Sequence, residues 1–170
     1  MSVPPTLDSP CPATQSASPE QAAQVLRQFR VVFNAVRTHF QQVEKRVGIG
    51  GAQVWALNVI RQQPGVGVNE LARAMDIHQS TASNLIRQLV KRELVRTEKS
   101  SVDRRGVQLF IEAAGEQLLQ GAPGPYEGVL PEALQQLSPA TLDQLQQNLA
   151  QVIQALQADE QAGGIPLAEL

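Results

Sequence analysis

The amino-acid sequence predicts a mainly α-helical protein that carries one small β-hairpin. Most apolar residues recur at intervals of three or four positions, which is the period of an amphipathic helix. Two neighbouring runs, 94–100 and 106–111, have the character of strands, and the polar loop "SVDRR" joins them. With 170 residues the chain fits one domain, or one domain with extensions.

The N-terminal part predicts a long helix over residues 19–47. Ser18 is placed as its N-cap, Pro19 takes the first helical position, and Gln21 follows the cap by three residues. The apolar positions of this helix are Val25, Phe29, Val32, Val36, Phe40, Val43 and Val47. Residues 1–18 are rich in Pro, Ser and Thr and show no apolar period, so we expect a disordered arm.

The middle of the chain predicts a buried helix over 52–63, a turn at 64–67 and a short helix over 69–75. A tight turn and another helix follow, and then the hairpin. After the hairpin we expect short helices and one longer helix that starts at a second Ser-Pro pair, followed by a loose tail. Their ranges are 113–120, 127–137, 138–156 and 161–170. The longer helix carries an apolar stripe of two heptads made by Leu142, Leu145, Leu149, Val152 and Leu156.

The helix that follows the tight turn, from about residue 80 to 92, carries the functional signal. Its expected inner face consists of Ala82, Leu85, Ile86 and Leu89. Its outer face has no carboxylate and combines hydroxyl and amide groups with cations. These are Ser80, Asn84, Arg87 and Lys91, with Thr81, Ser83 and Gln88 on the flanks. Amide and guanidinium groups can read base edges in the major groove, and hydroxyls suit phosphates. Together with the short helix before it, this helix predicts a helix-turn-helix that reads DNA.

The hairpin places Arg104 and Arg105 behind Asp103 at its tip. A hairpin beside a recognition helix is a wing, and its tip reaches the adjacent minor groove or the phosphate backbone. We expect Asp103 to point inward and to orient one of the two arginines through a charge-assisted hydrogen bond.

The distribution of charge supports this interpretation. The net charge is −2, yet residues 61–105 hold nine Lys and Arg against five acids. Residues 106–170 hold eight acids and no Lys or Arg. Such asymmetry is typical of a basic working surface followed by an acidic region.

From about Phe40 to Gly115 the sequence resembles the MarR family of winged-helix transcriptional regulators. The segments "GAQVWALNVI", "VNELARAMDIHQSTASNLIRQLVKRELVR" and above all "SSVDRRGVQLFI" carry the resemblance. It implies a homodimer with interlocked N- and C-terminal helices that represses transcription at a pseudo-palindromic operator. Half-sites would lie about 10 bp apart. The implied units are a dimerisation helix at 19–47, a winged helix-turn-helix at 48–112 and C-terminal dimerisation helices at 113–160.

The residues that we expect to bind DNA lie on the recognition helix and on the hairpin. They are Gln79, Ser80, Thr81, Ser83, Asn84, Arg87, Lys91, Lys99, Arg104 and Arg105.

The resemblance also implies a small aromatic acid or phenol as effector, bound between the dimerisation region and the DNA-binding lobe. The candidate residues are Arg37, His39, Phe40 and Trp55. A cation or imidazole would meet a carboxylate, and the rings would stack on the ligand. The alternative for each is a plain role in the core or on the surface.

Two positions depart from the family pattern. Glu93 stands where the family usually has Gly after the recognition helix. A left-handed glutamate costs roughly 1 kcal/mol, so we expect the helix to end differently here. Glu112 stands where the family tends to have a Thr that caps the next helix.

Other functions remain as alternatives. The two histidines, His39 and His78, lie far apart, and no catalytic triad, phosphate loop or metal-ligand cluster occurs, so we expect no enzyme, metal or cofactor. His78 is interpreted as a helix cap or a phosphate contact. A winged helix that binds proteins, and a regulator that senses redox through Cys11, stay open.

Sequence features also predict the compartment. A single cysteine excludes an intramolecular disulfide, and neither a secretory signal nor an apolar run of membrane-spanning length occurs. We therefore expect a cytoplasmic protein without a membrane partner.

Overall fold

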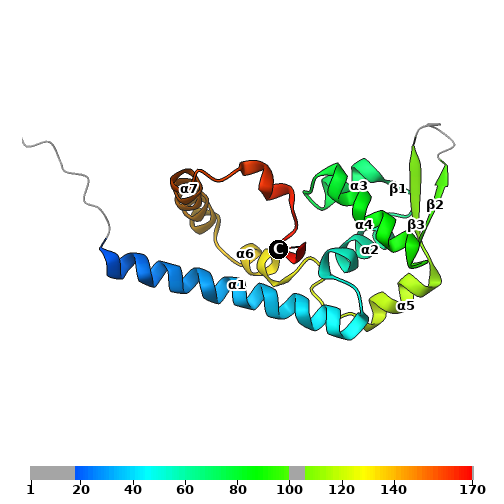
Figure 1. Cartoon of the computed structure of the whole chain (residues 1–170), viewed down its shortest axis with the longest axis horizontal. Helices are drawn as coiled ribbons and strands as arrows, with labels where there is room; N and C mark the ends of the chain where they lie inside the picture. The colour runs from blue at the N-terminus through cyan, green and yellow to red at the C-terminus, as the bar shows by residue number, and fades with distance from the viewer. Residues whose placement is uncertain (1–17, 100–105, 170) are drawn as a thin grey trace, which may run out of the picture.

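The computed structural model describes residues 18–99 and 106–169 (Figure 1). The helices are α1 (Pro19–Val47), α2 (Gly51–Gln62), α3 (Val68–Ala74), α4 (Gln79–Lys91), α5 (Ala113–Gly121), α6 (Val129–Gln135) and α7 (Pro139–Leu156). The strands are β1 (Val66–Gly67), β2 (Val95–Lys99) and β3 (Val107–Ile111), and two 3-10 turns close the chain, η1 (Glu160–Gly164) and η2 (Leu167–Glu169). The mainly helical winged fold predicted from the sequence is confirmed. None of the described helices is both long and apolar enough to cross a bilayer.

Helix α1 begins at the predicted cap. The Ser18 hydroxyl accepts a hydrogen bond from the Gln21 amide at 3.2 Å, and the Gln21 side chain accepts one from the Ser18 amide at 3.1 Å. The two bonds satisfy amides that the helix itself leaves free. The helix ends at Gly48, whose φ of 75° is left-handed.

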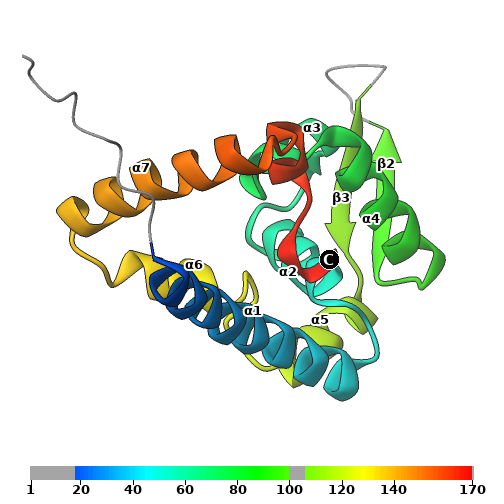
Figure 2. The same cartoon turned by 60° about the vertical axis from the view of Figure 1, so that its left-hand side comes forward.

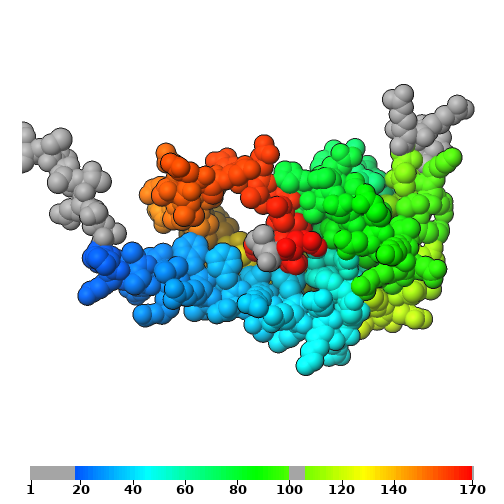
Figure 3. All heavy atoms as spheres, viewed as in Figure 1, coloured from blue at the N-terminus to red at the C-terminus, as the bar shows by residue number. Residues whose placement is uncertain are grey.

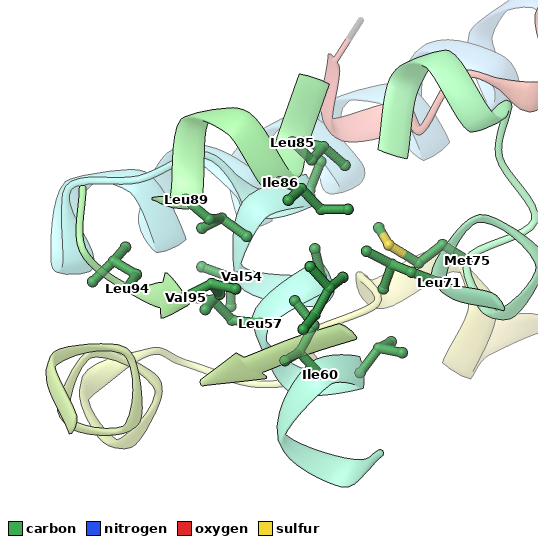
Figure 4. Close-up of a cluster of buried hydrophobic side chains, with 14 of the residues drawn as sticks. Val54, Leu57, Ile60, Leu71, Met75, Leu85, Ile86, Leu89, Leu94 and Val95 are labelled. Carbon is green, nitrogen blue, oxygen red and sulfur yellow. The ribbon is translucent and has the colours of Figure 1, made fainter. Parts of the chain in front are cut away.

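The core lies where α2, α3, α4 and the sheet meet (Figure 4). Helix α2 runs through its centre, which explains why nine of its twelve residues are buried. The predicted inner face of α4 is confirmed, because Ala82, Leu85, Ile86 and Leu89 are all buried. Further members of this core include Val54, Leu57, Ile60, Leu71, Met75, Leu94, Val95 and Leu109.

The hairpin belongs to a three-stranded antiparallel sheet with the order β1-β3-β2. Strand β3 pairs with β2 from Val95 opposite Ile111 to Lys99 opposite Val107. The sequence predicts only a turn at 64–67, but Val66 pairs with Leu109 there. A strand of two residues shows no alternation, so only its pairing with β3 defines it.

The C-terminal part departs from the globule and then returns to it. None of the 18 residues of α7 is buried, and Figure 2 shows this helix crossing above α1. The chain then turns back through η1 and η2, and η2 packs against α1 and α2. Pro166 is buried in this contact. The sequence predicts a loose tail at residues 161–170. The described residues 161–169 instead form most of η1 and all of η2, and they pack against the globule with Pro166 buried.

Candidate nucleic-acid interface

The recognition helix α4 presents a polar face that is free of acids. Exposed side chains follow one another along it, namely Gln79, Ser80, Asn84, Arg87, Gln88 and Lys91, while Thr81 and Ser83 are half-buried. The short helix α3 packs against α4 in the predicted helix-turn-helix arrangement. Short polar groups thus lie near the N-terminal end of α4, and cations near its middle and C-terminal end.

Two candidate base-reading residues touch each other. An Arg87 guanidinium nitrogen, Nη1, donates a hydrogen bond to Asn84 Oδ1 at 3.0 Å. Both side chains are exposed, so the bond orients them without burying them. The Ser83 hydroxyl donates back to the Gln79 carbonyl at 2.8 Å, as serine hydroxyls inside helices often do.

The rest of the fold fixes the position of α4. The Gln53 amide, buried in α2, donates a hydrogen bond to the Gln88 side-chain oxygen. Just beyond the C-terminal end of α4, the Arg92 guanidinium donates to the Gly48 carbonyl at 2.8 Å. The sequence alone does not predict that Gln53 and Arg92 position α4, because Gln88 and Gly48, the residues that they contact, lie 35 and 44 positions away along the chain.

The C-terminal end of α4 has the left-handed residue that the sequence analysis expected Glu93 to prevent. Glu93 adopts the left-handed conformation with φ 58°, so the helix ends as it would with glycine. The Leu94 amide donates to the Leu89 carbonyl and the Glu93 amide donates to the Val90 carbonyl, both at 3.0 Å, which is the Schellman pattern. Leu94 is buried beside this turn, and that burial offsets the strain at Glu93.

The wing is described up to its tip. Lys99 is exposed at the end of β2, whereas Asp103, Arg104 and Arg105 lie outside the described residues. The guanidinium of Arg96 stacks over the Phe110 ring, 4.7 Å from its centroid. Its nitrogens are 2.9 Å from a Glu98 carboxylate oxygen and 3.7 Å from one of Glu112. Arg96 is therefore paired with carboxylates within the wing, and Lys99 is a second exposed cation of the described part of the wing.

Glu112 starts α5 without a side-chain cap, and its carboxylate faces Arg96. Where the family tends to have a capping Thr, this chain therefore has a Glu whose side chain contacts Arg96 at the base of the wing and does not cap α5.

A second feature lies between α1 and α2. Phe40 and Trp55 border a small cavity of about 100 Å³ together with Val36, Ala52, Val129 and Leu130. Phe40 is held closely, because a Cβ added at Gly51 would meet its ring at 2.1 Å and one at Gly128 at 2.8 Å. The described residues that line the cavity include the acidic residue Glu127 and no Lys, Arg or His.

The other two effector candidates lie elsewhere. His39 is buried, and its Nε2 is 3.0 Å from the Pro125 carbonyl. Arg37 is exposed and does not line the cavity. The structure thus brings together Phe40 and Trp55, but it does not add the two candidates that were expected to meet a carboxylate.

His78 precedes α4 but does not cap it with its side chain. Its Nε2 lies 2.6 Å from the carbonyl of Gln161, so this nitrogen donates to the C-terminal part of the chain. His78 is the N-cap residue of α4, but it contributes its backbone carbonyl, which accepts from the Ala82 amide, and no capping hydrogen bond from its side chain. No group of three or more metal-ligating side chains occurs within residues 18–99 and 106–169. Cys11 lies outside the described residues.

Comparison with known proteins gives a consistent result. Residues 47–106 match the model of the MarR family. Among solved structures, Sco3205, a MarR family transcriptional regulator from Streptomyces coelicolor in complex with DNA, has 21% identity and a TM-score of 0.59. The match covers 88% of this chain and 96% of Sco3205.

Two further solved structures are similar in fold to this chain. The S. aureus MepR–DNA complex has 22% identity and a TM-score of 0.54, over 79% of this chain and 97% of MepR. A MepR-like protein complexed with pseudoligands has 15% identity and a TM-score of 0.56, over 79% of this chain and 94% of that protein. No curated protein matches the chain by sequence. The segment 47–106 of this chain is therefore similar to the MarR family model, and the described chain shares its winged-helix fold with these solved structures.

Proposed function

We propose that the protein is a transcriptional regulator that binds duplex DNA through α4 and the wing. The observation that carries this proposal is the outer face of α4, which is exposed, free of carboxylates and held in a helix-turn-helix. Two solved proteins of the same fold are complexes with DNA. One of them, Sco3205, is a MarR family transcriptional regulator.

The assignments within this surface follow from chemistry. Asn84 and Arg87 read base edges in the major groove, because amide and guanidinium groups match adenine and guanine there. Lys91 and Lys99 contact phosphates, as do Gln79, Ser80, Thr81 and Ser83 near the N-terminal end of α4. Arg104 and Arg105 contact DNA from the tip of the wing.

The protein acts as a homodimer, in which the N-terminal half of α1 and the apolar stripe of α7 cover one another. Their apolar side chains are exposed in the single chain, with Val31 at 65%, Phe33 at 56% and Leu156 at 71%. Exposed apolar patches of this kind mark interaction surfaces. A two-fold dimer would present two recognition helices to half-sites about 10 bp apart, and occupation of such a site represses transcription.

The effector site is the cavity at Phe40 and Trp55. The two rings and the aliphatic side chains suit a small aromatic ring, and Glu127 disfavours a carboxylate beside it. A phenol or another uncharged aromatic compound therefore fits better than an aromatic acid. At about 100 Å³ the cavity must widen to admit the ligand, which couples binding to a change in shape.

The test is fluorescence anisotropy with duplex DNA from the region upstream of the coding sequence, beside a scrambled duplex, over a salt series. We expect tight binding that prefers the upstream duplex and falls steeply with salt. Absence of binding to both duplexes at low salt would reject the proposal and point to a winged helix that binds proteins.

A further inference from the structure

The C-terminal segment, defined here as residues Glu160–Glu169, folds back onto the DNA-binding half of the molecule. Figure 3 shows it against the parts of the surface formed by α2, α3 and α4. It comprises η1, η2 and the two residues between them, and it follows the exposed helix α7.

The segment lines one side of the cavity proposed for the effector. Pro166 is buried, and Pro166, Leu167 and Ala168 line this cavity together with Phe40 and Trp55. Ala168 also packs against the core. The segment therefore forms one wall of this small cavity, so a ligand that needs a wider cavity competes with the docked segment.

The turn before the recognition helix holds the segment at a second point. The His78 amide donates to the Gly164 carbonyl at 3.0 Å, and His78 Nε2 lies 2.6 Å from the Gln161 carbonyl. A Cβ added at Gly164 would lie 2.7 Å from the His78 ring, so a larger residue at this position forces that ring to shift. One histidine thus ties the segment to the residue where α4 begins.

The segment also reaches the reading face of α4. Ile165 and Glu169 border a cavity of about 340 Å³ whose other walls include Thr81, Asn84 and Arg87. Two of these α4 residues are the proposed base readers. The segment itself holds two acids, Glu160 and Glu169, and no Lys or Arg. A carboxylate at this place repels the phosphates of an approaching duplex.

We propose that the C-terminal segment is an autoinhibitory element that competes with DNA for the face of α4 and with the effector for the cavity at Phe40 and Trp55. DNA binds after the segment leaves α4, so the docked state lowers the apparent affinity by the ratio of docked to free molecules. This inference rests on the proposed DNA-binding function and adds regulation of that same site.

A pair of glycine variants tests the docking. Gly164→Ala places a methyl group against the His78 ring, whereas Gly163→Ala is the matched control, since no described atom lies within 4 Å of a Cβ there. Trp55 is the only tryptophan of the chain, and it borders the cavity of which the segment forms one wall. We expect Gly164→Ala to shift its emission to longer wavelength, as water reaches the ring, and Gly163→Ala to leave it unchanged.

DNA affinity is the second measurement, on the full chain, both glycine variants and a chain that ends at Ala158, after α7. We expect Gly164→Ala and the shortened chain to bind upstream duplex DNA about tenfold more tightly than the original, which corresponds to about 1.4 kcal/mol of docking. Gly163→Ala should bind like the original.

The outcomes separate the two proposals. Equal DNA affinity of the original and shortened chains would overturn autoinhibition and leave the DNA-binding function intact. Absence of DNA binding by every chain would overturn both. An unchanged Trp55 emission in the shortened chain would also overturn the inference, because the segment would not cover the cavity.

Discussion

Replacing Arg87 and Lys91 in turn should separate base reading from phosphate binding on α4. Arg87 lies near the middle of the exposed face and bonds to Asn84 at 3.0 Å, while Lys91 is the last residue of the helix. A guanidinium in mid-helix faces base edges in the groove, whereas a cation at the helix end faces the backbone. We therefore expect Arg87→Ala to lose sequence preference and Lys91→Ala to lose salt-dependent affinity.

The expected magnitudes follow from the type of contact. Loss of one bidentate contact to a base costs about 1–3 kcal/mol, which lowers the preference for operator over random DNA by about 5- to 150-fold for each half-site. Loss of one phosphate contact reduces the salt slope by about 0.9, and hence by about 1.8 for a dimer. Arg87→Ala should show the first effect, and Lys91→Ala the second with nearly unchanged preference.

The assay is anisotropy with upstream and scrambled duplexes at several salt concentrations. Lys45→Ala is the matched control, because it removes one exposed cation from the last turn of α1, outside the surfaces proposed for DNA and for dimerisation. If Arg87→Ala keeps the preference for the upstream duplex, the reasoning about the reading face is refuted. If Lys91→Ala keeps the salt slope, its phosphate contact is refuted.

Three further predictions concern stability and assembly. Leu89→Ala, at a side chain with no exposed surface, should lower the free energy of unfolding by about 2–5 kcal/mol in urea titrations, and a loss below about 1 kcal/mol would contradict the packing. Glu93→Gly should raise that free energy by up to about 1 kcal/mol, because glycine adopts the φ of 58° without strain; a decrease would mean that Glu93 makes a compensating contact. Phe33→Asp places a charge on the exposed apolar face of α1 and should convert dimer to monomer in sedimentation at micromolar concentration, while a dimer that persists would place the interface elsewhere.

Local signals account for most of what the sequence predicts correctly. The first turn of α1 needs only Ser18, Pro19 and Gln21, so its start is readable from three neighbouring residues. The inner face of α4 follows from the spacing of four apolar residues, and all four are buried. The order of helices and hairpin therefore needs no long-range information.

The site is predicted in part for the same reason. The candidate DNA-binding residues of α4 share one helix face, so their periodicity alone places them together. The effector candidates come from two different helices, and sequence cannot decide which of them meet. Phe40 and Trp55 share a cavity, while His39 bonds to Pro125, which is 86 positions away.

Glu93 shows how tertiary packing overrides local preference. The residue disfavours a left-handed conformation, so the sequence predicts another ending for α4. Burial of Leu94 and the two closing hydrogen bonds nevertheless stabilise that conformation. Backbone strain of this size is small beside the burial of a leucine side chain, which contributes about 1.5–3 kcal/mol.

The sequence by itself determines the helices, the hairpin and the acid-free face of α4, because caps and apolar periods act between residues at most four positions apart. Only the tertiary structure decides that β1 pairs with β3, that Gln53 contacts Gln88, and that Pro166 returns to the cavity beside Trp55. These contacts join residues separated by 35 positions or more, and the free energy that forms them comes from burying surfaces that only the assembled fold creates.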